Sequence, residues 1–319
     1  MALLQRSPCD PDRPRTLRAS TLAVATTLAV LLLSTVALAL PRPSASASGG
    51  TWVPEPGPYL PDAPWSTLSP YLSEDLELGR PLVIEVFVPL CSNDQIDCGS
   101  AVAGRPGSLD TNLYWGAVFG ARRFLDRPHS VWTRLELTPV DSVELRRATY
   151  RRQVPAARFE LERREPVTQI VVLHAIHGSA IDQAVRRFWE RAASGGTVTF
   201  HDGVRERTER VHAVGYAGHN RLLDGVKLPP VPRSWEPVPA FVLSCYSEPT
   251  FRRPLLRVGA RPLVMTRALM APEGYLLEAV LRGLGDNQST RELRSRAVRS
   301  YAAWQRLSPA QAGRIFAPR

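Results

Sequence analysis

Short apolar runs that end at a reactive side chain are the feature that most constrains how this sequence can fold. The run AVGYAG leads to His219, and the run FVLS leads to Cys245. Both runs are rich in β-branched or aromatic residues and are bounded by Gly or Pro, which predicts buried strands. Strands that are apolar at nearly every position are typical of a parallel sheet covered on both faces. In such sheets, ligands bind beyond the carboxyl ends of the strands, where His219 and Cys245 lie.

Strands and helices alternate along the rest of the chain. Further strands are predicted at 81–90, 168–176 and 261–269. Helices are predicted at 112–127, from a Ser179 to Asp182 capping box to Gly195, at 271–285, from about Ser289, and after a Ser308-Pro309 cap. The segment 131–164 alternates apolar and charged residues, and Asp202-Gly203 predicts a hairpin turn. The pattern indicates an α/β three-layer sandwich with a mostly parallel sheet and a small antiparallel insert.

The N-terminus has the pattern of an export segment. Four arginines precede the uncharged run 19–40, and Ala37-Leu38-Ala39 fits a signal-peptidase site. The run is also nearly long enough to span a bilayer, so a cleaved signal peptide and a retained membrane anchor are both open. Residues 41–80 are rich in Pro and predict a linker or arm. The predicted divisions are therefore 1–40, 41–80 and a domain at 81–319, exported to the periplasm or secreted.

The formal net charge of +10 does not predict binding to nucleic acid. Lys227 is the only lysine, and the arginines are scattered among acidic residues rather than gathered into a basic run. No Gly-rich phosphate loop and no GxSxG motif is present, and we expect no cofactor. His174 and His177 point to opposite faces of a strand and lack a nearby third ligand, so we expect no metal site there.

The pairing of a thiol with an imidazole is the minimum needed for acyl transfer by cysteine. Neighbouring strands would bring Cys245, as nucleophile, close to His219, as general acid and base. Two alternatives remain open. Cys245 is a core residue of a non-catalytic exported domain that binds a protein or envelope component, or Cys91 joins His219 and Cys245 in a thiol or metal site.

Cysteine spacing predicts one disulfide. In an oxidising compartment Cys91 and Cys98 are close in sequence, and Cys245 is left over. We therefore expect a Cys91–Cys98 bond.

Several segments also resemble known proteins. NLYWGAVFGARRFL, AVGYAGHNRLLDG, FVLSCYSEPTF and ALMAPEGYLLEAV are similar to a family of exported bacterial proteins without an assigned activity, over roughly 81–316. The order of a strand with His and then a strand with Cys resembles the caspase-like cysteine peptidases, which include gingipains, legumains and separases. This resemblance implies a caspase-like fold, a peptide or protein substrate, a catalytic pair of Cys245 and His219, and oxyanion or substrate contacts at Gly218 and Asn220. In that superfamily Gly follows the His, whereas here Asn220 does.

Overall fold

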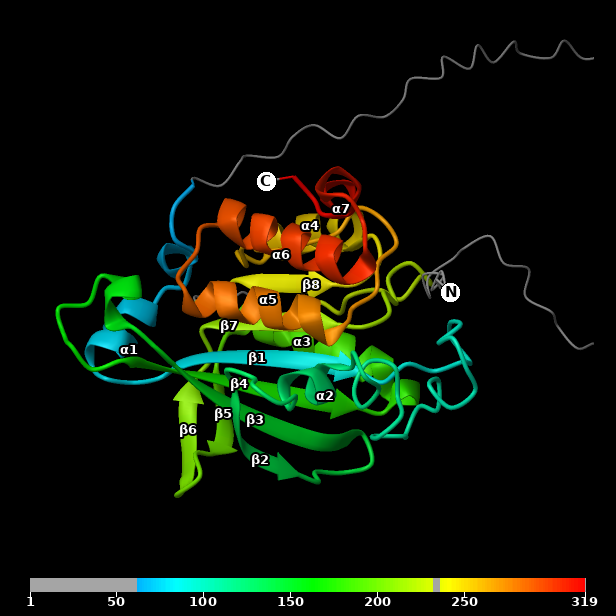
Figure 1. Ribbon diagram of the computed structural model, residues 1–319, viewed down its shortest axis with the longest axis horizontal. Coiled ribbons are helices and arrows are strands. Elements are labelled where there is room, and N and C mark those ends of the chain that lie inside the picture. The colour runs from blue at the N-terminus through cyan, green and yellow to red at the C-terminus, as the bar shows by residue number, and fades with distance from the viewer. Residues whose placement is uncertain (1–61, 232–235, 319) are drawn as a thin grey trace, which may run out of the picture. The chain divides into compact units, whose positions relative to one another are not determined.

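The structure, a computed structural model, describes residues 62–231 and 236–318, and its centre is a six-stranded sheet (Figure 1). The strands of the chain are β1 (Leu82–Pro89), β2 (Thr133–Thr138), β3 (Glu144–Val154), β4 (Val167–Ile176), β5 (Thr197–His201), β6 (Glu206–Arg210), β7 (Ala213–Ala217) and β8 (Ala240–Leu243). The sheet has the order β2-β3-β4-β1-β7-β8, and β4, β1, β7 and β8 run parallel. β5 and β6 form a separate antiparallel pair around the predicted turn. The predicted α/β fold with a mostly parallel sheet is therefore confirmed.

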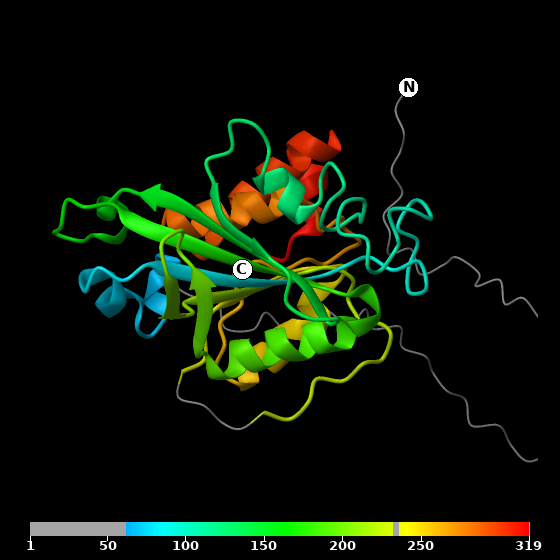
Figure 2. The ribbon, with the colours of Figure 1, turned by 90° about the horizontal axis from the view of Figure 1, so that it is seen from below.

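Helices cover both faces of the sheet (Figures 1 and 2). The helices are α1 (Leu72–Glu77), α2 (Ala121–Leu125), α3 (Ile181–Ser194), α4 (Ser247–Arg257), α5 (Gly274–Gly285), α6 (Thr290–Gln305) and α7 (Pro309–Ile315), with 3-10 turns at Trp65–Leu68, Ala156–Phe159 and Gly178–Ala180. Side chains alternate along β8, because successive residues of a strand face opposite sides. Phe241 and Leu243 join the core beneath α5 and α6, and Val242 joins the core beneath α3 and α4.

A buried group of charges connects α3 to the sheet. His174 on β4 lies between two carboxylates, with Nδ1 2.8 Å from Glu144 Oε1 and Nε2 3.0 Å from Glu85 Oε1. From α3, Arg187 pairs with Glu144 and Arg191 pairs with Glu85. All three central groups are at least 95% buried as side chains, so their charges depend on one another for compensation.

The segment just before β1 packs against the domain, as an arm that docks through its aromatic residues would. Trp65 is fully buried, and its Nε1 donates a hydrogen bond to the Leu284 carbonyl at 2.7 Å. Asp75 of α1 is also buried and lies 3.0 Å from His212 Nε2. The ordered domain therefore extends N-terminal to residue 81.

The predicted helix at 112–127 is wrong over most of its length, because only α2 is helical there. Asn112 accepts a hydrogen bond from Cys91 N at 2.9 Å and donates one to the Cys91 carbonyl at 2.8 Å, which fastens the start of the segment to the end of β1. A Cβ on Gly116 would overlap the Leu109 carbonyl, so the chain folds closely back on itself there. These local contacts replace the regular helical hydrogen bonds.

Two other local predictions are also wrong. The segment 261–269 runs beside β8, with Leu263 N donating to the Ala240 carbonyl at 2.8 Å, but it forms only isolated bridges, from Pro262 to Ala240 and from Thr266 to Phe316. Pro262 has no N–H, which interrupts a regular ladder. Ser179 does not cap α3; its hydroxyl lies 2.7 Å from His177 Nδ1 instead. The predicted end of α3 at Gly195 is confirmed.

The two C-terminal helix starts are confirmed. Ser289 before α6 and Ser308 before α7 each form a complete capping box, with Glu292 and Gln311 as the reciprocal partners. Across residues 62–231 and 236–318, no helix combines the length and the apolar character needed to span a bilayer. The apolar run 19–40 lies outside the described residues.

Candidate functional site

The carboxyl ends of β1 and β7 meet where the order of the parallel strands reverses, which is where ligands bind in open α/β sheets. The two chain segments approach closely at this point. A Cβ on Gly218 would lie 2.7 Å from Pro89 Cγ, so only glycine fits there. Gly218 N donates to the Leu243 carbonyl at 3.2 Å, and it therefore continues the sheet instead of facing an oxyanion as predicted.

His219 forms a pair with an acid that the sequence analysis did not select. Its Nε2 lies 2.7 Å from Asp224 Oδ2, and Arg221 contacts the same carboxylate at 2.6 Å. Nδ1 is buried and has no hydrogen-bond partner among residues 62–231 and 236–318. Burial lowers the pKa of His219, and this effect exceeds the opposite effect of Asp224. The ring is therefore neutral near pH 7, with Nε2–H donating to Asp224 and Nδ1 unprotonated.

Cys245 lies in the core of the domain. Its side chain is fully buried. Its Sγ lies 3.4 Å from both the backbone N and the carbonyl oxygen of Met270. It packs with Phe241 and Leu243 in the core beneath α5 and α6.

The residues that contact His219 and those that contact Cys245 lie on opposite faces of the sheet. Asp224, which binds His219, connects through Arg221 to Asp182 of α3, at 2.8 Å. Cys245 contacts the other side, beneath α5. The described contacts of Cys245 Sγ are to Met270 and not to His219 Nε2, which pairs with Asp224. The structure therefore does not form the predicted thiol and imidazole pair.

Asn220 has a structural task in place of the predicted substrate contact. It is fully buried, and its Nδ2 donates to the Cys245 carbonyl at 2.7 Å and to Thr250 Oγ1 at 3.0 Å. These bonds tie the segment after β7 to the first turns of α4. The side-chain N–H groups of Asn220 are therefore already used within the protein and are not available to bind a substrate.

The predicted Cys91–Cys98 disulfide is confirmed, with an S–S distance of 2.04 Å and a Cα–Cα distance of 6.1 Å. Both cysteines are buried. Because the sulfur of Cys91 is in this bond, it is not available as a thiolate ligand beside His219 and Cys245. Within the described ranges, no group of three or more His, Cys, Asp or Glu residues could hold a metal ion.

Comparison with known proteins does not identify a relative of this chain. In comparisons with protein families, curated proteins and solved structures, none matched this chain.

A strained residue at the end of β8 was not found from the sequence. Tyr246, at the start of α4, has φ 48° and ψ 41°, the left-handed region that glycine normally occupies. Such strain costs on the order of 1 kcal/mol and often marks a functional turn. Here it places Cys245 inward and lets α4 begin directly after the strand.

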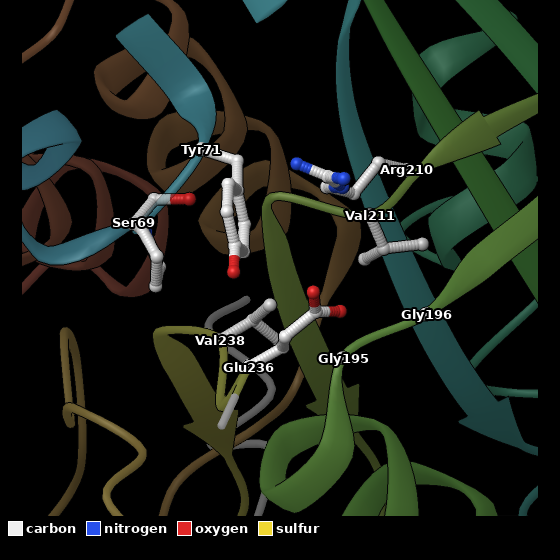
Figure 3. A pocket seen from close by; sticks show the side chains of 9 residues that line it. Ser69, Tyr71, Gly195, Gly196, Arg210, Val211, Glu236 and Val238 are labelled. Atoms are coloured by element: carbon white, nitrogen blue, oxygen red, sulfur yellow. The ribbon is translucent and has the colours of Figure 1, made fainter. Parts of the chain in front are cut away.

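Two hollows of very different size lie away from the carboxyl edge. The smaller one, between Tyr71, Arg210 and Glu236, has a volume of about 10 Å³, enough for a water molecule (Figure 3). The larger one measures about 650 Å³ and lies between α3, α4 and the connection from β7 to β8. Only the larger hollow has the volume of a ligand site.

Proposed function

We propose that this chain is an exported, non-catalytic binding domain of caspase-like α/β topology, whose ligand is an envelope component. The state of Cys245 carries this proposal. A fully buried sulfur that contacts Met270 lacks the exposed thiolate that nucleophilic catalysis needs. The order of β4, β1, β7 and β8, with His219 after β7 and Cys245 after β8, supports the caspase-like topology.

Export is supported independently by the Cys91–Cys98 bond. Disulfides persist in oxidising compartments and are rare in the cytosol. This agrees with the export segment predicted at 1–40.

The proposal is tested by measuring hydrolysis of a mixed peptide library by wild type, Cys245→Ala and His219→Gln proteins, each purified from the exported fraction. We expect the same background rate for all three. The control His129→Asn changes an exposed histidine. Hydrolysis by wild type and by the control that is abolished in both other variants would establish catalysis and overturn the proposal.

Alkylation gives a second test that does not depend on choosing a substrate. Because Cys245 is fully buried, iodoacetamide should label it only after denaturation in the presence of a reductant, as mapped by mass spectrometry. Rapid labelling of Cys245 in the native, unreduced protein would contradict a non-catalytic core residue. Loss of that labelling in His219→Gln would further identify His219 as its base.

A further inference from the structure

The larger hollow, of about 650 Å³, is formed by three elements that are distant in sequence. Trp189 comes from α3, Pro254 and Val258 come from the end of α4, and Leu222 and Leu228 come from the connection between β7 and β8. Figure 2 shows this connection, in yellow-green, running past α3. Apolar side chains therefore line the hollow from three directions.

The connection is fixed against α3 by a direct hydrogen bond. Trp189 Nε1 donates to the Pro229 carbonyl at 2.8 Å. This bond satisfies the polar atom of the indole, so Trp189 presents an apolar surface to the hollow. The position of one wall is thereby set by a specific contact.

The charged groups that line the hollow have one sign. Lys227 and Arg257 are exposed and line it, and among the residues that the structure describes no Asp or Glu lines it. Within the described part of the chain, neither cation forms a salt bridge. Lys227 is also the only lysine among the 40 basic residues. An apolar surface with two uncompensated cations at its edge is complementary to an apolar molecule that carries an acidic group.

We propose that this hollow binds a free, monomeric anionic amphiphile, an alkyl chain that ends in one carboxylate. This inference rests on the proposed binding function and names its ligand class. The chain occupies the surface between Trp189, Leu228 and Val258, and the carboxylate lies near Lys227 and Arg257. The volume fits one small molecule, since ligand pockets measure roughly 300–1,000 Å³.

The test uses laurate as the probe and equilibrium dialysis of the exported protein. Lys227→Gln and Arg257→Gln should each weaken binding roughly two- to fivefold, and the double variant about tenfold, as expected for exposed ion pairs. Arg253→Gln is the matched control, because Arg253 is an exposed arginine of α4 that does not line the hollow. It should bind laurate as wild type does. A quaternary ammonium with the same alkyl chain should bind more weakly than laurate.

Salt gives a readout that separates charge from apolar contact. Raising the ionic strength from about 0.01 M to about 1 M shortens the screening length from about 30 Å to about 3 Å. The difference between wild type and the double variant should therefore shrink. Equal laurate binding by wild type and double variant at low salt would overturn the site, as would binding of anionic vesicles without binding of free laurate.

Acylation of Lys227 locates the ligand directly. Because the chain has no other lysine, an amine-reactive ester modifies one side chain besides the N-terminus. Laurate should slow modification of Lys227 and leave the N-terminus unaffected. An unchanged rate at Lys227 in the presence of saturating laurate would place the ligand elsewhere and contradict the proposal.

The failures of the two proposals differ. Peptide hydrolysis that requires Cys245 and His219 would overturn the binding function itself. Absence of that hydrolysis together with absence of laurate binding would overturn only the ligand class. The Lys227 and Arg257 variants do not touch either residue, so the two results are independent.

Discussion

His174 is a buried base whose pKa is raised by two neighbouring carboxylates. Burial by itself lowers the pKa of His174, but Glu144 and Glu85 outweigh this effect and raise it. Burial likewise favours a higher pKa for Glu144, yet His174 and Arg147 hold it at about 2. Arg187 and Arg191 face the same group from α3. Each of these buried charges is therefore stabilised by the opposite charges beside it, and removing one would leave its partners uncompensated.

This set predicts a pH optimum of stability. The contribution of His174 is fully present below its unfolded pKa, near 6.5, and is lost as pH rises through its raised folded pKa. The contribution of Glu144 is present above its unfolded pKa, near 4.5, and is lost as pH falls toward about 2. We therefore expect the charged group to contribute most to the free energy of unfolding between about pH 4.5 and about pH 6.5. Urea unfolding of wild type and His174→Gln as a function of pH measures it.

His174→Gln should lower the free energy of unfolding by about 3 kcal/mol near pH 6, because it removes a cation buried between carboxylates. The loss should become smaller at alkaline pH. The control His129→Asn should leave the pH profile unchanged, since His129 is exposed. A constant difference between wild type and His174→Gln from pH 5 to high pH would show that His174 is neutral in the folded protein.

The Cys91–Cys98 bond gives a second prediction for single residues. The double change Cys91→Ala and Cys98→Ala should lower the free energy of unfolding by about 2.5 kcal/mol, because the short loop is no longer closed in the unfolded chain. Chemical denaturation without reductant measures this loss. Val102→Ser, at an exposed position shortly after this loop, should change stability little. A double variant as stable as wild type would contradict the prediction.

Part of the candidate site could be predicted from single residues and part could not. The Cys91–Cys98 bond followed from the spacing of the two cysteines together with the predicted export to an oxidising compartment. The partner of His219 did not, because Asp224 lies in an irregular connection whose course no periodic pattern reveals. Sequence placed Cys245 correctly after a buried strand, but the contact with Met270 depends on where a distant segment packs.

At the scale of elements, the start of α6 is fixed by its capping box. Ser289 Oγ accepts a hydrogen bond from Glu292 N at 3.3 Å, and the Glu292 carboxylate accepts one from Ser289 N at 2.9 Å. Ser289→Ala should lower the free energy of unfolding by about 1 kcal/mol. Thermal unfolding followed by circular dichroism measures the change.

Ser295→Ala is the control within the same helix. Its hydroxyl bonds to the Arg291 carbonyl within the helix, and alanine has the higher helix propensity. Stability should therefore stay the same or rise slightly. A loss at Ser295 as large as that at Ser289 would argue against a specific role of the cap.

Strands and helix starts could be predicted where either burial or a local cap alone determines them. β1 and β4 are buried along nearly their whole length, and their apolar composition revealed both. The cap residues Ser289 and Ser308 act through neighbours in sequence, and they were also found. The segment 112–127 has helical periodicity, but Asn112 and the close approach at Gly116 override it through contacts with Cys91 and Leu109. Such contacts are not visible in a linear pattern.

For the molecule as a whole, the arrangement of charges at the N-terminus predicts export of the domain. Arginines precede the run 19–40, and the side that carries them stays in the cytoplasm. A reporter that is active only outside the cytoplasm, fused after residue 50, should be active. Replacing the arginines before residue 19 with glutamate should reduce this activity. Activity of a cytoplasm-only reporter at the same junction would contradict export.

The central position of β1 also governs when the domain can fold. β1 is the first strand made, yet its two neighbours, β4 and β7, follow it after long intervening stretches of chain. Contacts between residues far apart in sequence form slowly, since a long loop must close before they contribute. During synthesis, β1 therefore has no strand to pair with until β4 and β7 have been made. A domain built in this order can close its sheet only after β7 and β8, which lie late in the sequence, have been synthesised.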